Sequence, residues 1–265
     1  MGELRYIRSM KHAFSLVELS IVLVILGLLT GGILGGQSLI RAAELRAVTT
    51  EYNRWVTATR TFQDKYFALP GDMTNAQSFW GVAHATPSVC EVTPSTTTAT
   101  CNGDGNGQVS YYAVGNSANE SFRFWQHLAN AGLIEGTYDG VTHGSNVYSA
   151  TSANVPKSRL GTGHWHISYW GSVTGDAYLF DGQYGNAMVV GGLLANDWPN
   201  TSLFKPEELW NIDTKLDDGR PAQGKVLSGG LFANCTTAAN SADLNADYRL
   251  NQPAVSCFLM SRNNF

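Results

Sequence analysis

The sequence has few charged side chains. Lys, Arg, Asp and Glu make up 14% of its 265 residues, against roughly 25% in an average globular domain. The 21 Asp and Glu residues outnumber the 17 Lys and Arg residues, which gives a net charge of -4. Attraction to nucleic-acid phosphates needs an excess of positive charge, so a nucleic-acid binder built on basic patches is excluded. Disorder is excluded as well, because 43% of the residues are hydrophobic and 11% are aromatic.

Motifs for catalysis and for zinc binding are also missing. The sequence has no G-x-S-x-G, H-E-x-x-H or P-loop motif, and none of its four cysteines has C-x-x-C spacing. His164 and His166 would share one face of a strand, but no third metal ligand lies nearby in the sequence, so we expect ordinary surface or packing roles for both. We therefore predict that the chain is not an enzyme.

The apolar residues concentrate near the N-terminus. From Phe14 to Gly36 the only charged residue is Glu18. A helix of this length extends over roughly 34 Å, enough to cross a hydrocarbon core of about 30 Å. A secretory signal would have a shorter apolar region followed by an A-x-A-like site, whereas glycines follow here. We predict that residues 14–36 span a membrane.

Helical periodicity continues beyond the apolar run. Apolar and aromatic residues recur every three or four positions, which predicts one helix over residues 14–66 that ends before the turn Leu69–Asp72. We expect its second half to pack this stripe onto the following domain. The stripe consists of Leu45, Val48, Tyr52, Trp55, Thr59, Phe62 and Tyr66.

Glu18 needs an explanation, because a carboxylate in a membrane helix costs about 2.5 to 3.5 kcal/mol at the centre and less near an end. No cationic side chain lies between Phe14 and Leu39. Two interpretations stay open: Glu18 reaches water at the membrane surface, or it pairs with a backbone amine created by a cut immediately before Phe14.

The run Ala13-Phe14-Ser15-Leu16-Val17-Glu18-Leu19 follows the basic residues Arg5, Arg8, Lys11 and His12. It resembles the prepilin leader motif of type IV pilins and type II secretion pseudopilins. The resemblance implies that a membrane aspartic peptidase, the prepilin peptidase, cuts between Ala13 and Phe14 and methylates the Phe14 amine. It also implies that Glu18, the fifth mature residue, pairs with the N-terminus of a neighbouring subunit. The family usually has Gly where this chain has Ala13.

The resemblance further implies a structural subunit of a pilus or of a type II secretion pseudopilus. The precursor would be a single-pass inner-membrane protein, and the basic leader on the cytoplasmic side would place the head in the periplasm. Its partners would be the membrane itself before assembly, the prepilin peptidase, the inner-membrane assembly platform, copies of itself and other pilins or pseudopilins. The final location would be a periplasmic or extracellular filament. A second interpretation is a membrane-anchored periplasmic, calcium-dependent binding or adhesion module that does not polymerise.

Beyond the long helix the pattern predicts an α+β fold, with the helix packed on an antiparallel sheet, as in pilins. We expect a leader at 1–13, a helix at 14–66 and a head domain at 67–265. The remaining expected elements are listed by their ranges. Helices are expected at 72–80, at 120–133 and from Pro206 to the turn 217–219, strands at 164–170, 177–180, 187–194, 225–232 and 254–260, and a loop at 86–100.

The four cysteines form two pairs that are close in sequence. Three disulfide pairings are possible, and proximity favours Cys90–Cys101 with Cys235–Cys257, each stabilising by about 3 kcal/mol. The second bridge resembles the C-terminal disulfide loop of pilins. Free buried thiols are the alternative.

One loop resembles the first half of a calcium-binding EF-hand loop. Asn102, Asp104 and Asn106 occupy positions 1, 3 and 5, followed by Gly107 at position 6. The candidate calcium ligands are Asn102, Asp104, Asn106, Gln108 and Glu120, the last replacing the Glu that an EF-hand has at position 12. The alternative is a Gly/Asn turn held by Cys101. We interpret a second acidic group, Asp213, Asp217 and Asp218, as a helix end and turn.

Overall fold

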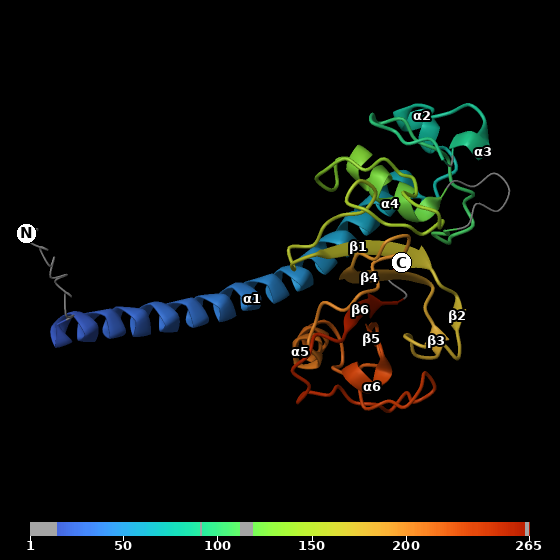
Figure 1. The fold of residues 1–265 in the computed structure, drawn as a ribbon. Coiled ribbons are helices and arrows are strands. Elements are labelled where there is room, and N and C mark those ends of the chain that lie inside the picture. Colours follow the sequence, from blue (N-terminus) through green and yellow to red (C-terminus); the bar gives the residue numbers. More distant parts are fainter. Residues whose placement is uncertain (1–14, 91, 112–118, 263–264) are drawn as a thin grey trace, which may run out of the picture. The chain divides into compact units, whose positions relative to one another are not determined.

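The fold is described from a computed structural model covering residues 15–90, 92–111, 119–262 and 265. These residues form two compact units, one up to Ala43 and one from Glu44 to Phe265, which we call the head. The boundary lies within the first helix, α1 (Leu16–Tyr66). Figure 1 shows the elements in chain order.

Ser15 and Glu18 fix the start of α1 at Leu16. The Ser15 hydroxyl accepts the Val17 N–H (3.3 Å), and the Glu18 carboxylate accepts the Ser15 N–H (2.8 Å). This reciprocal pair is a capping box, in which two backbone N–H groups without helical partners are both satisfied. The expected start at Phe14 is outside the described residues, and Ser15 serves as the cap that precedes the helix.

The first part of α1 exposes its apolar side chains. Large hydrophobic residues from Leu16 to Ile40 are at least half exposed within the chain. By length and composition the helix is able to cross a membrane. Burial of these side chains therefore requires a lipid or protein surface other than the described chain.

The part of α1 that belongs to the head buries its aromatic stripe, as predicted. Val48, Trp55 and Phe62 are buried. The Trp55 ring meets Trp125 of α4 (Glu120–Asn130) edge to face, with 5.5 Å between centroids. This packing makes the second half of α1 part of the head core.

The central sheet has four antiparallel strands in the order β1-β4-β6-β5. The strands are β1 (Gly163–Tyr169), β4 (Asn186–Gly192), β5 (Val226–Gly229) and β6 (Phe258–Ser261). A separate pair joins β2 (Ser172–Val173) to β3 (Gly182–Gln183). The predicted α+β class, with a long helix and an antiparallel sheet, is confirmed.

Both faces of the sheet are buried. Alternate strand residues point to opposite faces: Met188 and Leu259 belong to the main core with α1 and α4, whereas Val189 and Met260 belong to a second core. Leu179 packs in that second core. The strands consequently read as almost continuously buried.

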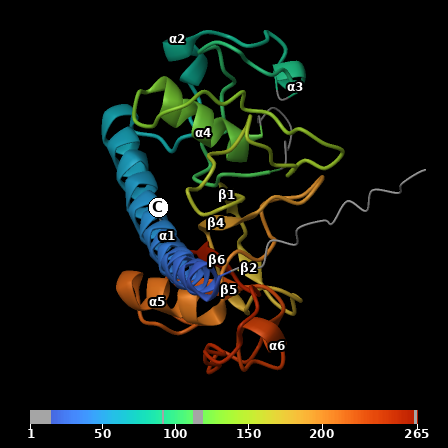
Figure 2. The same cartoon turned by 60° about the vertical axis from the view of Figure 1, so that its left-hand side comes forward.

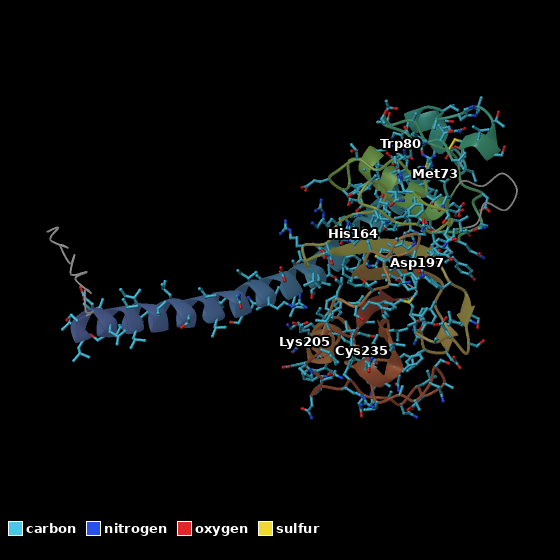
Figure 3. All side chains as sticks on the ribbon, viewed as in Figure 1. Met73, Trp80, His164, Asp197, Lys205 and Cys235 are labelled. Atoms are coloured by element: carbon cyan, nitrogen blue, oxygen red, sulfur yellow. A yellow bond between two sulfur atoms is a disulfide. The ribbon has the colours of Figure 1, made fainter. Side chains whose placement is uncertain are left out.

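Four short helices complete the head: α2 (Ala76–Trp80), α3 (Pro87–Cys90), α5 (Pro206–Leu216) and α6 (Phe232–Cys235). Helix α4 contacts β1, while α5 and α6 contact β5, and Figures 1 and 2 show α4 and α5 near opposite edges of the sheet. In Figure 3, Met73 and Trp80 mark the region of α2, and Cys235 marks α6.

Several expected element boundaries were wrong. Residues 177–180 form a turn instead of a strand, because the Asp176 carboxylate accepts the N–H groups of Tyr178 and Leu179. The expected helix at 120–133 ends at Asn130, two residues before Gly132 with its positive φ of 72°. The expected strand at 225–232 stops at Gly229, and the helix α6 begins at Phe232.

Two further segments differ for related reasons. In the expected helix 72–80 only α2 is helical, because the Asp72 carboxylate binds backbone groups of another loop. In the expected strand 254–260, β6 begins only at Phe258; Cys257 pairs with Phe204 and forms a disulfide. The expected loop 86–100 contains the short helix α3.

The structure contains the two disulfides favoured by proximity. Cys90 is bonded to Cys101 and Cys235 to Cys257, and all four sulfur-bearing residues are buried. The first bridge joins α3 to the residue before the glycine-rich loop, which comprises residues 102–108, and the second joins α6 to the residue before β6.

Candidate functional site

The N-terminal candidate site is described from Ser15 onward. The predicted processing residues Ala13 and Phe14 lie outside the described residues, so their roles stay predictions. Glu18 lies in the exposed first turn of α1, where its negative charge is favoured by the helix dipole. One carboxylate oxygen, Oε2, accepts the Ser15 N–H, and no hydrogen bond from the described residues is found at Oε1.

The head contains a second candidate site made of three carboxylates. Asp72 follows the end of α1, Asp104 lies in the glycine-rich loop and Glu120 begins α4. One oxygen from each lies within 4.8 Å of the others. Asp72 and Glu120 are almost completely buried, at 4% and 0% exposure. Such a group favours a bound cation or a proton, because buried like charges repel each other.

The glycine-rich loop wraps around the Asp72 carboxylate. Backbone N–H groups of Gly105, Asn106 and Gly107 donate to it at 2.7, 3.0 and 2.9 Å. Gly105 and Gly107 have positive φ angles of 76° and 82°, which glycine adopts without steric cost. Gly103 is needed for another reason: a Cβ atom there would lie 2.4 Å from the Gly71 carbonyl oxygen.

Burial raises the pKa of two of these carboxyl groups, Glu120 and Asp72. The pKa of Glu120 is raised to about 8, and the nearby Asp72 and Asp104 raise it further against the lowering effect of two backbone N–H donors. The pKa of Asp72 is raised to about 6, again mainly by burial and partly by Asp104. In the described part of the chain these three carboxylates form no ion pair with Lys or Arg.

The structure brings together two of the predicted calcium ligands, Asp104 and Glu120, and adds Asp72. The side-chain oxygen of Asn102 instead accepts the Gln77 N–H, and that of Asn106 accepts the Gln108 N–H. No signal in the sequence pointed to Asp72, because its position depends on a contact between two loops that are about thirty residues apart. That contact includes a hydrogen bond from the Gly103 N–H to the Met73 carbonyl (2.9 Å).

The second acidic group has structural partners. Asp213 accepts the Tyr248 hydroxyl (2.8 Å) and the Gly219 N–H (3.2 Å), and burial raises its pKa to about 7. Asp217 accepts the backbone N–H groups of Lys225 and Val226. These bonds hold the turn between α5 and β5, in agreement with its interpretation as a helix end and turn.

His164 and His166 of β1 lie in the core. Both are buried, and the His166 ring packs against Phe122, with 5.5 Å between centroids. The expected packing roles therefore fit their environment.

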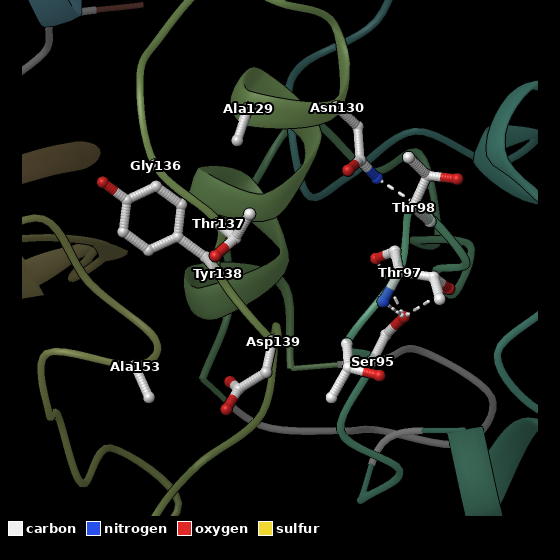
Figure 4. Close-up of a pocket in the computed structure, with 11 residues that line it drawn as sticks. Ser95, Thr97, Thr98, Ala129, Asn130, Gly136, Thr137, Tyr138, Asp139 and Ala153 are labelled. Carbon is white, nitrogen blue, oxygen red and sulfur yellow. Dashed lines mark hydrogen bonds between the residues drawn. The ribbon is translucent and has the colours of Figure 1, made fainter.

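A hydroxyl-rich pocket of about 550 Å³ lies between residues 95–98 and 136–139 beside the end of α4. Many of its polar groups pair with each other, as Figure 4 shows. The Asn130 side chain donates to the Thr98 carbonyl (2.7 Å), and the Ser95 hydroxyl contacts Thr97. We call it the α4 pocket.

A comparison with protein families places a known motif over the N-terminal site. Residues 8–34 match the family model described as the prokaryotic N-terminal methylation motif, which is the leader signature of type IV pilins and pseudopilins. The match includes both predicted processing residues and Glu18. No curated protein and no solved structure matches the chain.

Proposed function

We propose that the chain is a structural, non-catalytic subunit of a pilus or type II secretion pseudopilus. The prepilin peptidase cuts the precursor between Ala13 and Phe14 and methylates the Phe14 amine. The carrying observation is the continuity of the methylation motif with α1, whose apolar side chains are exposed from Leu16 to Ile40. Lipid covers this surface before assembly, and neighbouring subunits cover it in the filament.

The proposal gives the precursor a single membrane span with the head in the periplasm. The inner-membrane assembly platform then moves the subunit into a periplasmic or extracellular filament. Glu18 acts at this step: its Oε1 pairs with the N-terminal amine of a neighbouring subunit while Oε2 continues to cap its own helix. An ion pair formed away from water is stronger than one at a wet surface, so it favours a fixed stagger between neighbouring helices.

Substitutions at Glu18 and Ser15 test this assignment. Glu18→Gln keeps an acceptor for the Ser15 N–H and loses the charge, whereas Ser15→Ala removes part of the capping box and keeps the charge. We expect Glu18→Gln to lower filament incorporation at least tenfold. Ser15→Ala should be incorporated about as well as the unmodified chain. Intact mass and N-terminal sequencing of the membrane-bound chain, with and without the peptidase, provide the processing readout.

When the peptidase is present, we expect N-methylated Phe14 at the start of the mature chain in the unmodified protein and in both variants. A chain that keeps its leader in the presence of the peptidase contradicts the proposed processing. Normal filaments from Glu18→Gln would show that helix capping is sufficient for assembly and that the negative charge of Glu18 is not needed.

The three carboxylates of the head favour a second candidate function, a membrane-anchored calcium-dependent binding module that does not polymerise. We propose Asp72, Asp104 and Glu120 as the calcium ligands, because carboxylate oxygens are the ligands that calcium prefers. Calcium would neutralise their mutual repulsion and hold the glycine-rich loop. Calcium binding itself is compatible with both functions, and filament incorporation that depends on Glu18 separates them.

A further inference from the structure

Phe67, the residue after α1, has an unusual position. The residue is 93% exposed, and its backbone has a positive φ of 55°. The Phe67 N–H donates to the Gln63 carbonyl (2.8 Å), which is the bond that ends many helices with a left-handed residue. Glycine is the usual residue there, because a Cβ atom makes the left-handed conformation less favourable. Glycine would make the same backbone bond without this steric cost, and the exposed ring adds no packing to the head, so the ring points to a role outside folding.

The Phe67 ring stands at the open edge of a pocket of about 560 Å³, which we call the Phe67 pocket. Its volume is within the range of small-molecule sites, about 300 to 1,000 Å³. A protein partner would typically cover about 800 Å² of mostly flatter surface. The lining consists of Gln63, Phe67, Ala68, Leu69, Asp72, Thr74, Gly105 and Gly107.

Two polar side chains of the Phe67 pocket are available to a ligand. The amide of Gln63 and the hydroxyl of Thr74 have no hydrogen bond within the part of the chain that the structure describes. Asp72 differs, because its two oxygens already accept three backbone N–H groups. The pocket thus combines an apolar ring with an uncharged amide and an uncharged hydroxyl.

We propose that the Phe67 pocket binds a neutral sugar. The apolar C–H face of a sugar ring would stack on Phe67, and its hydroxyl groups would bond to Gln63 and Thr74. An anionic ligand is disfavoured, because Asp72 lies within 4.8 Å of two further carboxylates. An amine is less suited than a sugar, because three backbone N–H groups take up most of the acceptor capacity of Asp72 and the remainder is assigned to the proposed calcium. This binding site is independent of filament assembly.

The α4 pocket provides an internal comparison. It also has hydroxyl groups, but many of them are paired within the chain, and the Tyr138 hydroxyl donates to the Glu135 carbonyl (3.3 Å). Figure 4 shows the Tyr138 ring directed away from the segment that carries Ser95 and Thr97. A substitution there serves as a control for binding at an unrelated polar pocket.

The test uses the full mature chain in a zwitterionic detergent without a sugar headgroup. Binding is measured on an array of neutral glycans, and the best oligosaccharide is then titrated by calorimetry. We expect Phe67→Gly to weaken binding at least tenfold with a melting temperature equal to or above that of the unmodified chain. Phe67→Tyr keeps the ring and should retain binding. Gln63→Ala should weaken binding about fivefold, and Thr137→Val in the α4 pocket should leave it unchanged.

The melting temperature separates loss of the site from loss of the fold. The proposal is overturned if no neutral glycan binds the unmodified chain, or if Phe67→Gly binds as tightly as before. It is also overturned if the Phe67 ring supports binding of amines in place of sugars, measured with lysine and choline. Self-association that is lost in Phe67→Gly, without any glycan binding, would assign the ring to a protein contact instead.

Discussion

At the scale of single residues, His127 connects three segments of the head. The Gly71 N–H donates to its Nδ1 (2.9 Å), and its Nε2 lies 2.9 Å from the Thr100 hydroxyl, which donates to the Gln126 side chain (2.6 Å). Because Nδ1 accepts and the Thr100 proton is given to Gln126, we assign the proton of a neutral imidazole to Nε2. Burial lowers the pKa of His127 to about 3, and the nearby Arg123 lowers it further.

We expect His127 to reduce stability in acid. Its pKa is about 6.5 in an unfolded chain and about 3 in the folded one, so the unfolded state binds more protons between these values. The stability that the neutral ring contributes is complete above pH 6.5 and is lost as the pH falls toward 3. From pH 6.5 to pH 5 the loss is about 2 kcal/mol, at 1.36 kcal/mol per pH unit.

The measurement compares urea unfolding of the unmodified chain and His127→Gln from pH 7 to pH 4, both with EDTA. The difference in unfolding free energy should be largest at pH 7 and shrink by about 2 kcal/mol by pH 5. The carboxyl groups with raised pKa values make stability fall as the pH rises, which is the opposite dependence. Both proteins contain these groups, so their contribution cancels in the difference. His84→Gln, on a partly exposed loop, is the control. A difference that does not change with pH would contradict the assigned neutral ring.

At the scale of elements, the glycine-rich loop and the start of α4 carry two of the three carboxylates of the proposed calcium site. The folded pKa of Glu120, about 8, is above its ordinary value of 4.5. Without metal, the stability from this group is present below pH 4.5 and is lost as the pH rises through 8. Calcium bound at the proposed site would offset this loss, because it would replace the proton by a positive charge.

We expect calcium to raise the melting temperature more at pH 8.5 than at pH 6, measured against EDTA. A calcium concentration of 100 times Kd corresponds to about 2.7 kcal/mol of added stability. Glu120→Gln should lose most of this response and weaken calcium binding about tenfold or more. Asp217→Asn, in the acidic group that holds the α5 turn, is the matched control. Equal calcium responses of Glu120→Gln and the unmodified chain would contradict the ligand set.

The sequence predicted those elements whose signals are local. The methylation motif and the buried stripe of α1 are read from adjacent or regularly spaced residues, and Val48, Trp55 and Phe62 are buried as expected. The segment 177–180 was read as a strand because turn bonding to Asp176 has no hydrophobic pattern. Asp72 was missed for a similar reason: its place beside Glu120 depends on packing between separate loops, which periodicity does not encode.

At the scale of the whole molecule, the two disulfides stabilise different parts of the head. The Cys90–Cys101 bridge precedes Asn102 and so anchors the glycine-rich loop, whereas Cys235–Cys257 anchors the approach to β6, which pairs with both β4 and β5. In the chain-entropy model, bridges with sequence separations of 11 and 22 each contribute about 3 kcal/mol. Their effects on total stability are therefore similar, and their effects on the carboxylate site differ.

Paired serine substitutions separate the two roles. Cys90→Ser with Cys101→Ser, and Cys235→Ser with Cys257→Ser, should each lower the unfolding free energy by about 3 kcal/mol in urea titrations. Calcium affinity, measured by calorimetry where both proteins are folded, should fall only in the first pair, because calcium must then also order the released loop. Equal loss of calcium affinity in both pairs would show that the site depends on general stability and has no specific dependence on the bridge beside it.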